Sequence, residues 1–248
     1  MYRVTEDVVV PYLRSGSLPS GEEELGLRTL LAPGELAAAL DRYSVKWGAD
    51  ACRQASASLW SKSLFAALLP GPTWLALTGR AIPAEPKLAV AGGVPEGFVV
   101  PAPSGPCGDP DATSLAAFLI GPVTGSVAAL VSASGLAPRV FWSNAASMLA
   151  WLIERFEAIP ETAEAARGFR AAILNAGSLP PHGVVNPMAN LIGYVPTAVP
   201  GYPGVTRRRR VCCLWDRLEA DQLCASCPKI DPADREAQLL AAMSVGKG

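Results

Sequence analysis

Four of the six cysteines in this 248-residue chain lie close together near its C-terminus. Cys212 and Cys213 are adjacent, Cys224 follows after ten residues, and Cys227 follows after two more. Four thiolates in so short a segment can ligate one tetrahedral metal ion or the two irons of a [2Fe–2S] cluster. The spacing therefore predicts a metal centre with four cysteine ligands.

The same spacing distinguishes a site for one metal ion from a site for a [2Fe–2S] cluster. Cys224 and Cys227 form the Cys-x2-Cys chelate that structural zinc sites use twice. Cys212 and Cys213 do not form a second one, because adjacent side chains in extended backbone point to opposite faces. The one histidine, His182, excludes a Rieske centre and a two-cysteine, two-histidine zinc site within one chain. We favour a [2Fe–2S] cluster, with a zinc site or a disulfide as the alternatives.

The cysteine segment also resembles that of a known family. Residues 209–213, Arg-Arg-Val-Cys-Cys, and residues 224–228, Cys-Ala-Ser-Cys-Pro, are similar to the C-terminal [2Fe–2S] segment of the FhuF-type ferric siderophore reductases. Residues 58–62, 141–146 and 186–188 resemble segments that this family carries in the same order. The resemblance implies one-electron reduction of an imported ferric siderophore, of hydroxamate type, with release of Fe(II) in the cytoplasm. It also implies an external one-electron donor, such as a ferredoxin or a flavin reductase system.

The rest of the chain must position this segment. Half of the residues are hydrophobic and 17% are charged, so a sizeable core is expected. Residues 176–206, rich in proline and glycine, are expected to be irregular. We therefore expect a helix-rich α+β fold, with a body domain over 1–205 and a C-terminal cluster segment over 206–248. The expected helices are 33–48, 50–69, 122–134, 143–158, 161–175 and 231–243, with a strand pair at 87–91 and 97–101.

Several classes of protein are disfavoured. The formal net charge of −1 argues against a dedicated nucleic-acid binder. No Gly-x-Gly-x-x-Gly follows a predicted strand and no Gly-x4-Gly-Lys-Ser/Thr occurs, so the chain offers no visible site for NAD(P)H, flavin or ATP. A redox protein without a hydride acceptor takes its electrons one at a time from a separate carrier.

Two features bear on the location of the protein. Residues 1–7 lack the basic and apolar regions of an export signal, so we expect a cytoplasmic protein. The charge-free run 112–138 is long enough to span a bilayer, but Gly121-Pro122 interrupts it. We expect two buried elements there, with peripheral membrane association or a membrane span as the alternatives.

The basic run 207–210 directly precedes the vicinal cysteines, and it has two interpretations. It is either a solvated linker or a set of charges that raises the cluster potential and steers an acidic donor or an anionic chelate. Arg209 and Arg210, nearest the ligands, are the candidates for that role. By default we expect Cys224 and Cys227 to share one iron and the vicinal pair to share the other.

The siderophore surface is marked less clearly. Trp142, Asn144, Asn186 and Tyr202 are candidates, because aromatic faces and amides often hold a large oxygen-rich ligand. A structural role is the alternative for each. Two rival functions stay open: a ferredoxin-like carrier that passes electrons to a protein, and a zinc-stabilised binding module. The large body argues against a simple carrier, which needs little beyond its cluster fold.

Overall fold

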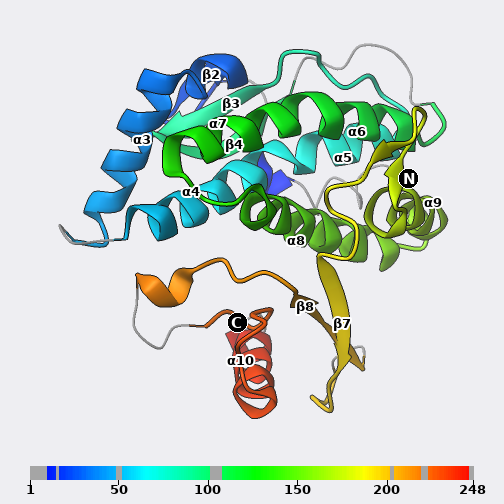
Figure 1. The fold of residues 1–248 in the computed structure, drawn as a ribbon. Coiled ribbons are helices and arrows are strands. Elements are labelled where there is room, and N and C mark those ends of the chain that lie inside the picture. Colours follow the sequence, from blue (N-terminus) through cyan, green and yellow to red (C-terminus); the bar gives the residue numbers. More distant parts are fainter. Residues whose placement is uncertain are drawn as a thin grey trace.

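The computed structural model describes residues 10–14, 17–48, 52–100, 108–201, 204–218 and 223–245. A helical body forms the larger part, and the cysteine segment lies against one side of it together with a hairpin and the last helix (Figure 1). The fold is α+β and helix-rich, as the sequence predicts.

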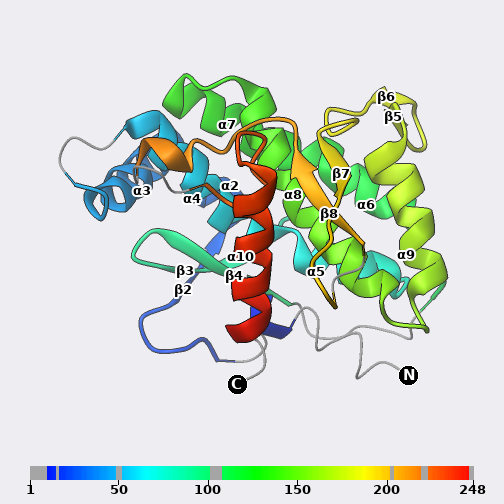
Figure 2. The same cartoon turned by 90° about the horizontal axis from the view of Figure 1, so that it is seen from below.

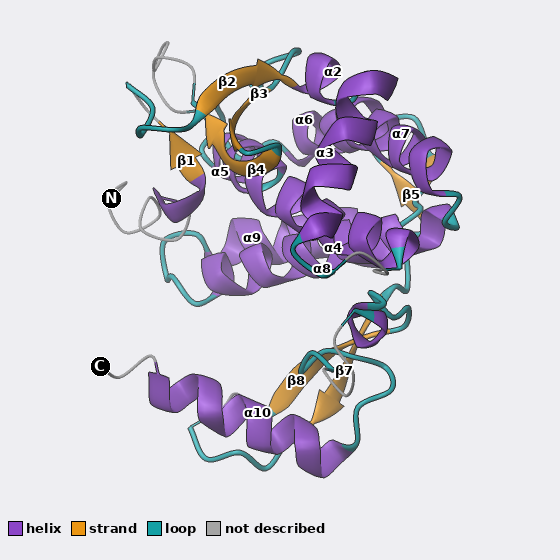
Figure 3. Cartoon of the chain, turned by 90° about the vertical axis from the view of Figure 1, so that its left-hand side faces the viewer, coloured by secondary structure: helices purple, strands orange, loops and turns teal. Residues whose placement is uncertain are grey.

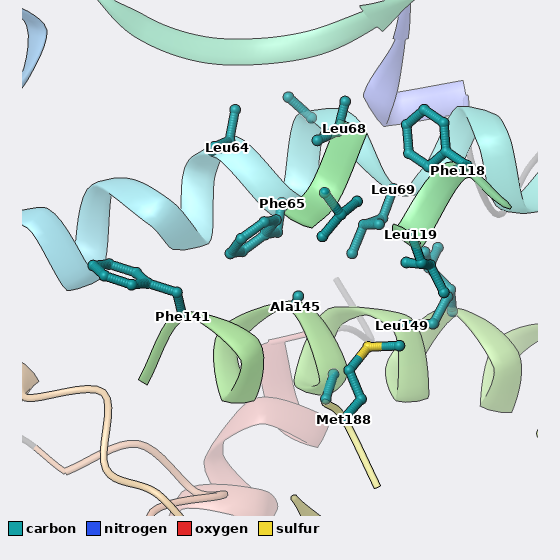
Figure 4. Close-up of a cluster of buried hydrophobic side chains, with 14 of the residues drawn as sticks. Leu64, Phe65, Leu68, Leu69, Phe118, Leu119, Phe141, Ala145, Leu149 and Met188 are labelled. Carbon is teal, nitrogen blue, oxygen red and sulfur yellow. The ribbon is translucent and has the colours of Figure 1, made fainter. Parts of the chain in front are cut away.

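Two long helices form the centre of the body. Helix α4 (Arg53–Leu68) is buried on nearly all sides, as expected for a helix with apolar and small residues around its whole circumference. Helix α8 (Pro138–Glu157) packs along it. Phe65 of α4 and Ala145 of α8 belong to the fully buried core between them, which also contains Met188 (Figure 4).

A small sheet covers α4 on another side. Its strand order is β1 (Leu13–Arg14), β4 (Val94–Val99), β3 (Lys87–Ala91) and β2 (Glu23–Gly26). Strands β2, β3 and β4 are antiparallel, and β1 runs parallel to β4. The predicted strand pair is confirmed, although β4 begins earlier than expected and the sheet has two further strands.

The buried indole of Trp60 ties α4 to this sheet. Its Nε1 donates a hydrogen bond of 2.9 Å to the carbonyl oxygen of Gly93, in the turn between β3 and β4. A buried indole N–H without a partner would be costly, so this bond fixes the hairpin turn over α4.

Two prolines lie at helix junctions. Helix α4 ends before Pro70, as the predicted helix 50–69 does, and Pro70 begins the new helix α5 (Pro70–Leu77), because proline is well suited to the first position of a helix. Pro122 does not interrupt the helical run in which it lies. It lies in a π-helical turn (Leu119–Val123), where wider winding accommodates a residue without an N–H.

That π-helical turn joins α6 (Ala112–Phe118) to α7 (Thr124–Ser134). The combined run is long and apolar enough to cross a bilayer. However, Leu115, Leu119 and Leu130 are fully buried in the protein core. A core helix of a soluble protein meets the same criteria of length and composition. The expectation of two separate elements is corrected, because the run is continuous.

Residues 176–206, predicted to be irregular, form two hairpins instead. Strands β5 (Ser178–Leu179) and β6 (Val184–Val185) form the first. Strands β7 (Ile192–Pro196) and β8 (Val205–Arg209) form the second, which lies between the body and helix α10 (Pro232–Val245) (Figures 1 and 3). The expected domain boundary at 205/206 falls at the start of β8.

The other predicted helices are confirmed with shifted ends. Helix α10 begins after Asp231, whose Oδ1 accepts a hydrogen bond of 2.8 Å from the backbone N–H of Ala233, as an N-cap residue does. The remaining elements are a 3-10 turn (Val10–Tyr12), α2 (Leu27–Leu30), α3 (Pro33–Val45), α9 (Ala163–Phe169) and a π-helical turn (Arg170–Asn175).

The packing of α5 against the sheet gives a stability prediction. Gly71 lies directly against the ring of the fully buried Phe98, so the Cβ of Gly71→Ala would overlap that ring. We expect Gly71→Ala to lower the free energy of unfolding by about 1–3 kcal/mol in chemical denaturation. In Gly125→Ala, on the exposed side of α7, the Cβ meets open space and should be neutral or stabilising. Equal stability of the two variants would contradict this packing.

Candidate metal centre

The cysteine segment follows β8 and turns sharply after the vicinal pair. Leu214 has φ 65, a left-handed conformation that is unusual for a residue other than glycine. Its backbone N–H donates a hydrogen bond of 3.3 Å to the Sγ of Cys212. A 3-10 turn (Trp215–Arg217) follows, and Cys224 and Cys227 lie in the turn before α10. The backbone is thus bent where two adjacent thiols must serve one centre.

The four thiols form two pairs. The Sγ atoms of Cys212 and Cys227 are 4.0 Å apart. Cys213 and Cys224 form the second pair, joined by a thiol–thiol hydrogen bond. Two thiolates on one tetrahedral ion, at a metal–sulfur distance of about 2.3 Å, would lie about 3.8 Å apart. The first pair therefore has nearly the spacing of two ligands on one metal.

This arrangement suits two metals better than one. Within the described residues, no group of three or more cysteine, histidine or acidic side chains converges on a single ion position. Two thiol pairs match the ligand set of a [2Fe–2S] cluster, in which each iron takes two cysteines. The residues therefore fit this cofactor. The thiol contacts are not those of the default expectation, in which Cys224 and Cys227 share one iron and the vicinal pair shares the other; that sharing of irons stays a prediction.

A hydrogen bond and two positive charges favour a thiolate at Cys213. Its pKa is lowered to about 5, chiefly because it accepts the hydrogen bond from Cys224, and the positive charges of Lys62 and Arg209 act in the same direction against burial. Burial raises the pKa of the Cys212 thiol to about 11, although the N–H of Leu214 acts in the opposite direction. Metal ligation requires thiolates, so cationic neighbours assist it.

Arg209 is a buried cation of this site, with 2% of its surface exposed; a second buried arginine, Arg235, donates to the carbonyl oxygens of Ala225 and Cys227 in the cysteine turn. The guanidinium of Arg209 donates to the Oδ1 of Asn144 and, at 3.3 Å, to the Oγ of Ser143. Among the described residues Arg209 forms no ion pair with a carboxylate. A buried charge without a counter-charge is costly, and the thiolates beside it supply one.

Asn144 holds this arginine in place. Its Nδ2 donates to the backbone oxygen of Ser58 at 2.9 Å and to the Oγ of Ser61 at 2.8 Å. The backbone N–H of Arg209 donates to the carbonyl oxygen of Ser226, at 2.8 Å, between the last two cysteines. One chain of hydrogen bonds thus runs from α4 through α8 and β8 to the cysteine turn.

The other site residues proposed from the sequence lie in different surroundings in the structure. Trp142 is buried in the core, and Asn186 is also buried, bonded to backbone groups at 173, 176 and 188. Arg210 is exposed, and its backbone N–H donates to the carbonyl oxygen of Leu191. Tyr202 lies outside the described residues. Of the proposed docking residues, Asn144 and Arg209 therefore come together beside the cysteines.

Lys62 is a site residue that sequence analysis missed. Its Nζ lies 5.1 Å from the centroid of the Trp215 ring, in the turn that follows the vicinal cysteines. It belongs to run 58–62, whose resemblance to the family was the only available signal. Lys62 is far from the cysteines in the sequence, so its spacing from them does not indicate that it lies beside them.

Polar contacts anchor the β7–β8 hairpin to α8. The Nε of Arg207 lies 3.0 Å from Oε2 of Glu154, and the hydroxyl of Tyr194 donates to Oε1 of Glu154 at 2.8 Å. Arg170 contacts the same hydroxyl and forms an ion pair of 2.7 Å with Glu157. Burial raises the pKa of Glu154, and the charge of Arg207 opposes this shift. These contacts place β8, and with it Arg209, against the body.

A helix-rich body with two thiol pairs beside a buried cation defines an iron–sulfur oxidoreductase. Residues 58–194 match the family described as ferric iron reductase FhuF-like transporter, and residues 209–229 match the FhuF 2Fe-2S C-terminal domain. The first match spans more than half of the chain. The chain belongs to the FhuF family, and its cofactor is a [2Fe–2S] cluster.

A solved structure supports the fold of the body. Aerobactin synthetase IucC from a hypervirulent pathotype of Klebsiella pneumoniae aligns with a TM-score of 0.50 and 17% identity. The alignment covers 69% of this chain but 37% of the synthetase, so this chain corresponds to a part of that protein. At this identity the likeness concerns the fold alone. No curated protein matches the chain.

The first prediction for this site concerns its metal. Protein purified without oxygen should contain about two irons and two acid-labile sulfides per chain, with negligible zinc, measured by elemental and sulfide analysis. Serine at any one of the four cysteines should remove or strongly perturb the cluster. Cys52→Ala and Cys107→Ala should retain it; Cys107 lies outside the described residues. Colourless, folded protein with stoichiometric zinc would contradict this assignment.

The second prediction concerns Arg209. A cation favours the reduced cluster, which carries one more negative charge, so Arg209→Gln should lower the reduction potential. The expected shift is on the order of 50 mV, measured by redox titration at the cluster absorbance. Arg209→Lys keeps the charge and should restore most of the potential. The exposed Arg210→Gln is the control and should shift it much less, so equal shifts in the two glutamine variants would refute the role.

Proposed function

We propose that this protein is a ferric siderophore reductase, which reduces the Fe(III) of an imported chelate by one electron and releases Fe(II) in the cytoplasm. The bound [2Fe–2S] cluster supplies single electrons. Fe(III) binds hard oxygen ligands tightly, whereas Fe(II) binds them far less strongly, so one electron converts a trapped ion into one that can leave. Membership of the FhuF family supports this reaction class.

The observation that carries the proposal is the unequal burial of the thiols. Cys213 and Cys227 are buried, whereas Cys212 and Cys224 are half-buried. Each thiol pair therefore has one member shielded by protein and one near the surface. A centre of this kind keeps water from two of its ligands and still lets a redox partner approach closely.

The side chains around the thiols have distinct roles in this proposal. The four cysteines hold the cofactor, and Arg209 supplies a fixed counter-charge that Asn144 orients. Lys62 adds a second positive charge at the more exposed edge. The electron donor is an external one-electron carrier, such as a ferredoxin or a flavin reductase system, and the siderophore is of hydroxamate type. Peripheral association with a membrane stays compatible with this role.

Turnover provides the test. Protein reduced with dithionite, freed of excess reductant and mixed with a ferric hydroxamate and a ferrous trap, should reoxidise with one Fe(II) captured per cluster. Stopped-flow absorbance at the cluster band and at the ferrous complex measures both. A cysteine-to-serine variant that lacks the cluster is the control and should capture no Fe(II). Reoxidation by a second redox protein but by no ferric chelate would replace the proposal with an electron-carrier function.

A further inference from the structure

A cavity of about 410 Å³ lies between α4, α8 and β8. Figure 2 shows β8 beside α8, on the side of the body that carries the cysteine segment. Its size is within the range of about 300–1,000 Å³ that small-molecule sites occupy. The residues of its wall that matter here are Lys62, Ala66, Asn144, Trp151, Arg207 and Arg209.

The wall of this cavity is positively charged. Its described lining contains Lys62, Arg207 and Arg209 but no acidic residue. Arg207 is balanced by Glu154, and Arg209 by the thiolates beside it. Lys62 forms no ion pair within the described residues. The positive charge that the cavity can offer a ligand is therefore chiefly that of Lys62.

The cavity also borders the cysteine segment. Arg209 lines it and is bonded through its backbone N–H to Ser226, between Cys224 and Cys227. Lys62 lines it too, and its Nζ lies over Trp215, two residues after Cys213. A ligand in this cavity would be separated from the thiols by the side chains of these two cations. An acceptor that takes one electron from the cluster must lie this close to the cysteines that hold it.

We propose that this cavity docks the ferric chelate and selects an anionic one, with at least one free carboxylate beside its iron-binding groups. This inference rests on the proposed reductase function. Lys62 binds the carboxylate, and the indole of Trp151 with the thioether of Met148, which also lines the cavity, provides an apolar wall for the chelate's carbon chain. A neutral chelate would displace water from the cations without replacing the lost interactions.

A protein donor is a less suitable occupant of this cavity. The carboxylates of an acidic carrier are best met by exposed cations on an open surface. Arg208 and Arg210 offer that, since both are exposed next to the cysteine segment. The cavity is instead a recess lined by α4, α8 and β8. The two kinds of partner can thus approach the same centre from different directions.

Binding of a redox-inert chelate tests the proposal without electron transfer. Ga(III) has the charge and nearly the size of Fe(III) but is not reduced under these conditions. The probes are two gallium trihydroxamates that differ in one group, a free carboxylate in the first and its primary amide in the second. Titration calorimetry on the cluster-loaded protein should show tighter binding of the carboxylate form, by about fivefold or more.

Variants locate the binding in the cavity. Lys62→Gln should remove most of the preference for the carboxylate form, whereas Lys87→Gln, the same change on the distant strand β3, should retain it. Ala66→Phe fills the cavity from α4 and should weaken binding of both probes at least tenfold, with an unchanged cluster spectrum as the check of folding. Lys62→Arg keeps the charge and should retain the preference, which separates loss of charge from loss of the side chain.

The outcomes separate this inference from the proposed function. Equal affinity for the two probes, or a preference that survives in Lys62→Gln, would overturn the selection of an anionic chelate. Full binding by Ala66→Phe would overturn the cavity assignment, while reduction of ferric chelates still stood in each case. If neither probe binds and no ferric chelate is reduced, the reductase function itself fails and the inference fails with it.

Discussion

A buried positive charge that lacks a carboxylate partner organises this site. Arg209 is almost fully buried, and its hydrogen-bond partners from α8 are neutral. Such a charge is tolerated only near an anion, and the thiolates of the cysteine segment provide it. Asn144 fixes the guanidinium from one side, and the cysteine turn accepts a hydrogen bond from its backbone on the other. These bonds, with the packing of Cys213 in the core, hold the cofactor segment against the body.

Local signals in the sequence predicted much of the body. Helices α3, α4 and α8 have regular apolar spacing, and the four cysteines indicate their chemistry by spacing alone. Asn144 was a correct candidate for a place beside the cysteines, but Trp142, two residues earlier, faces the core instead. Residues two apart on a helix point in different directions, and the sequence does not say which of the two faces the site.

Long-range packing determined what could not be predicted. The β7–β8 hairpin lies in a segment rich in proline and glycine, whose composition indicates turns and not the pairing partners between them. Lys62 reaches the site because α4 packs along α8, a contact between segments far apart in sequence. The thiol pairing depends on the left-handed turn at Leu214, which spacing rules do not contain.

The anchoring of the hairpin has a consequence for how the two parts can change. Arg207, Tyr194 and Glu154 join the β7–β8 hairpin to α8 through charged and hydroxyl groups. Cys213, a cluster ligand, lies in the hydrophobic core itself, and Ile192 and Val211 pack against that core. The electron-carrying segment is therefore not an independent attachment, because altering it also alters the packing of the body.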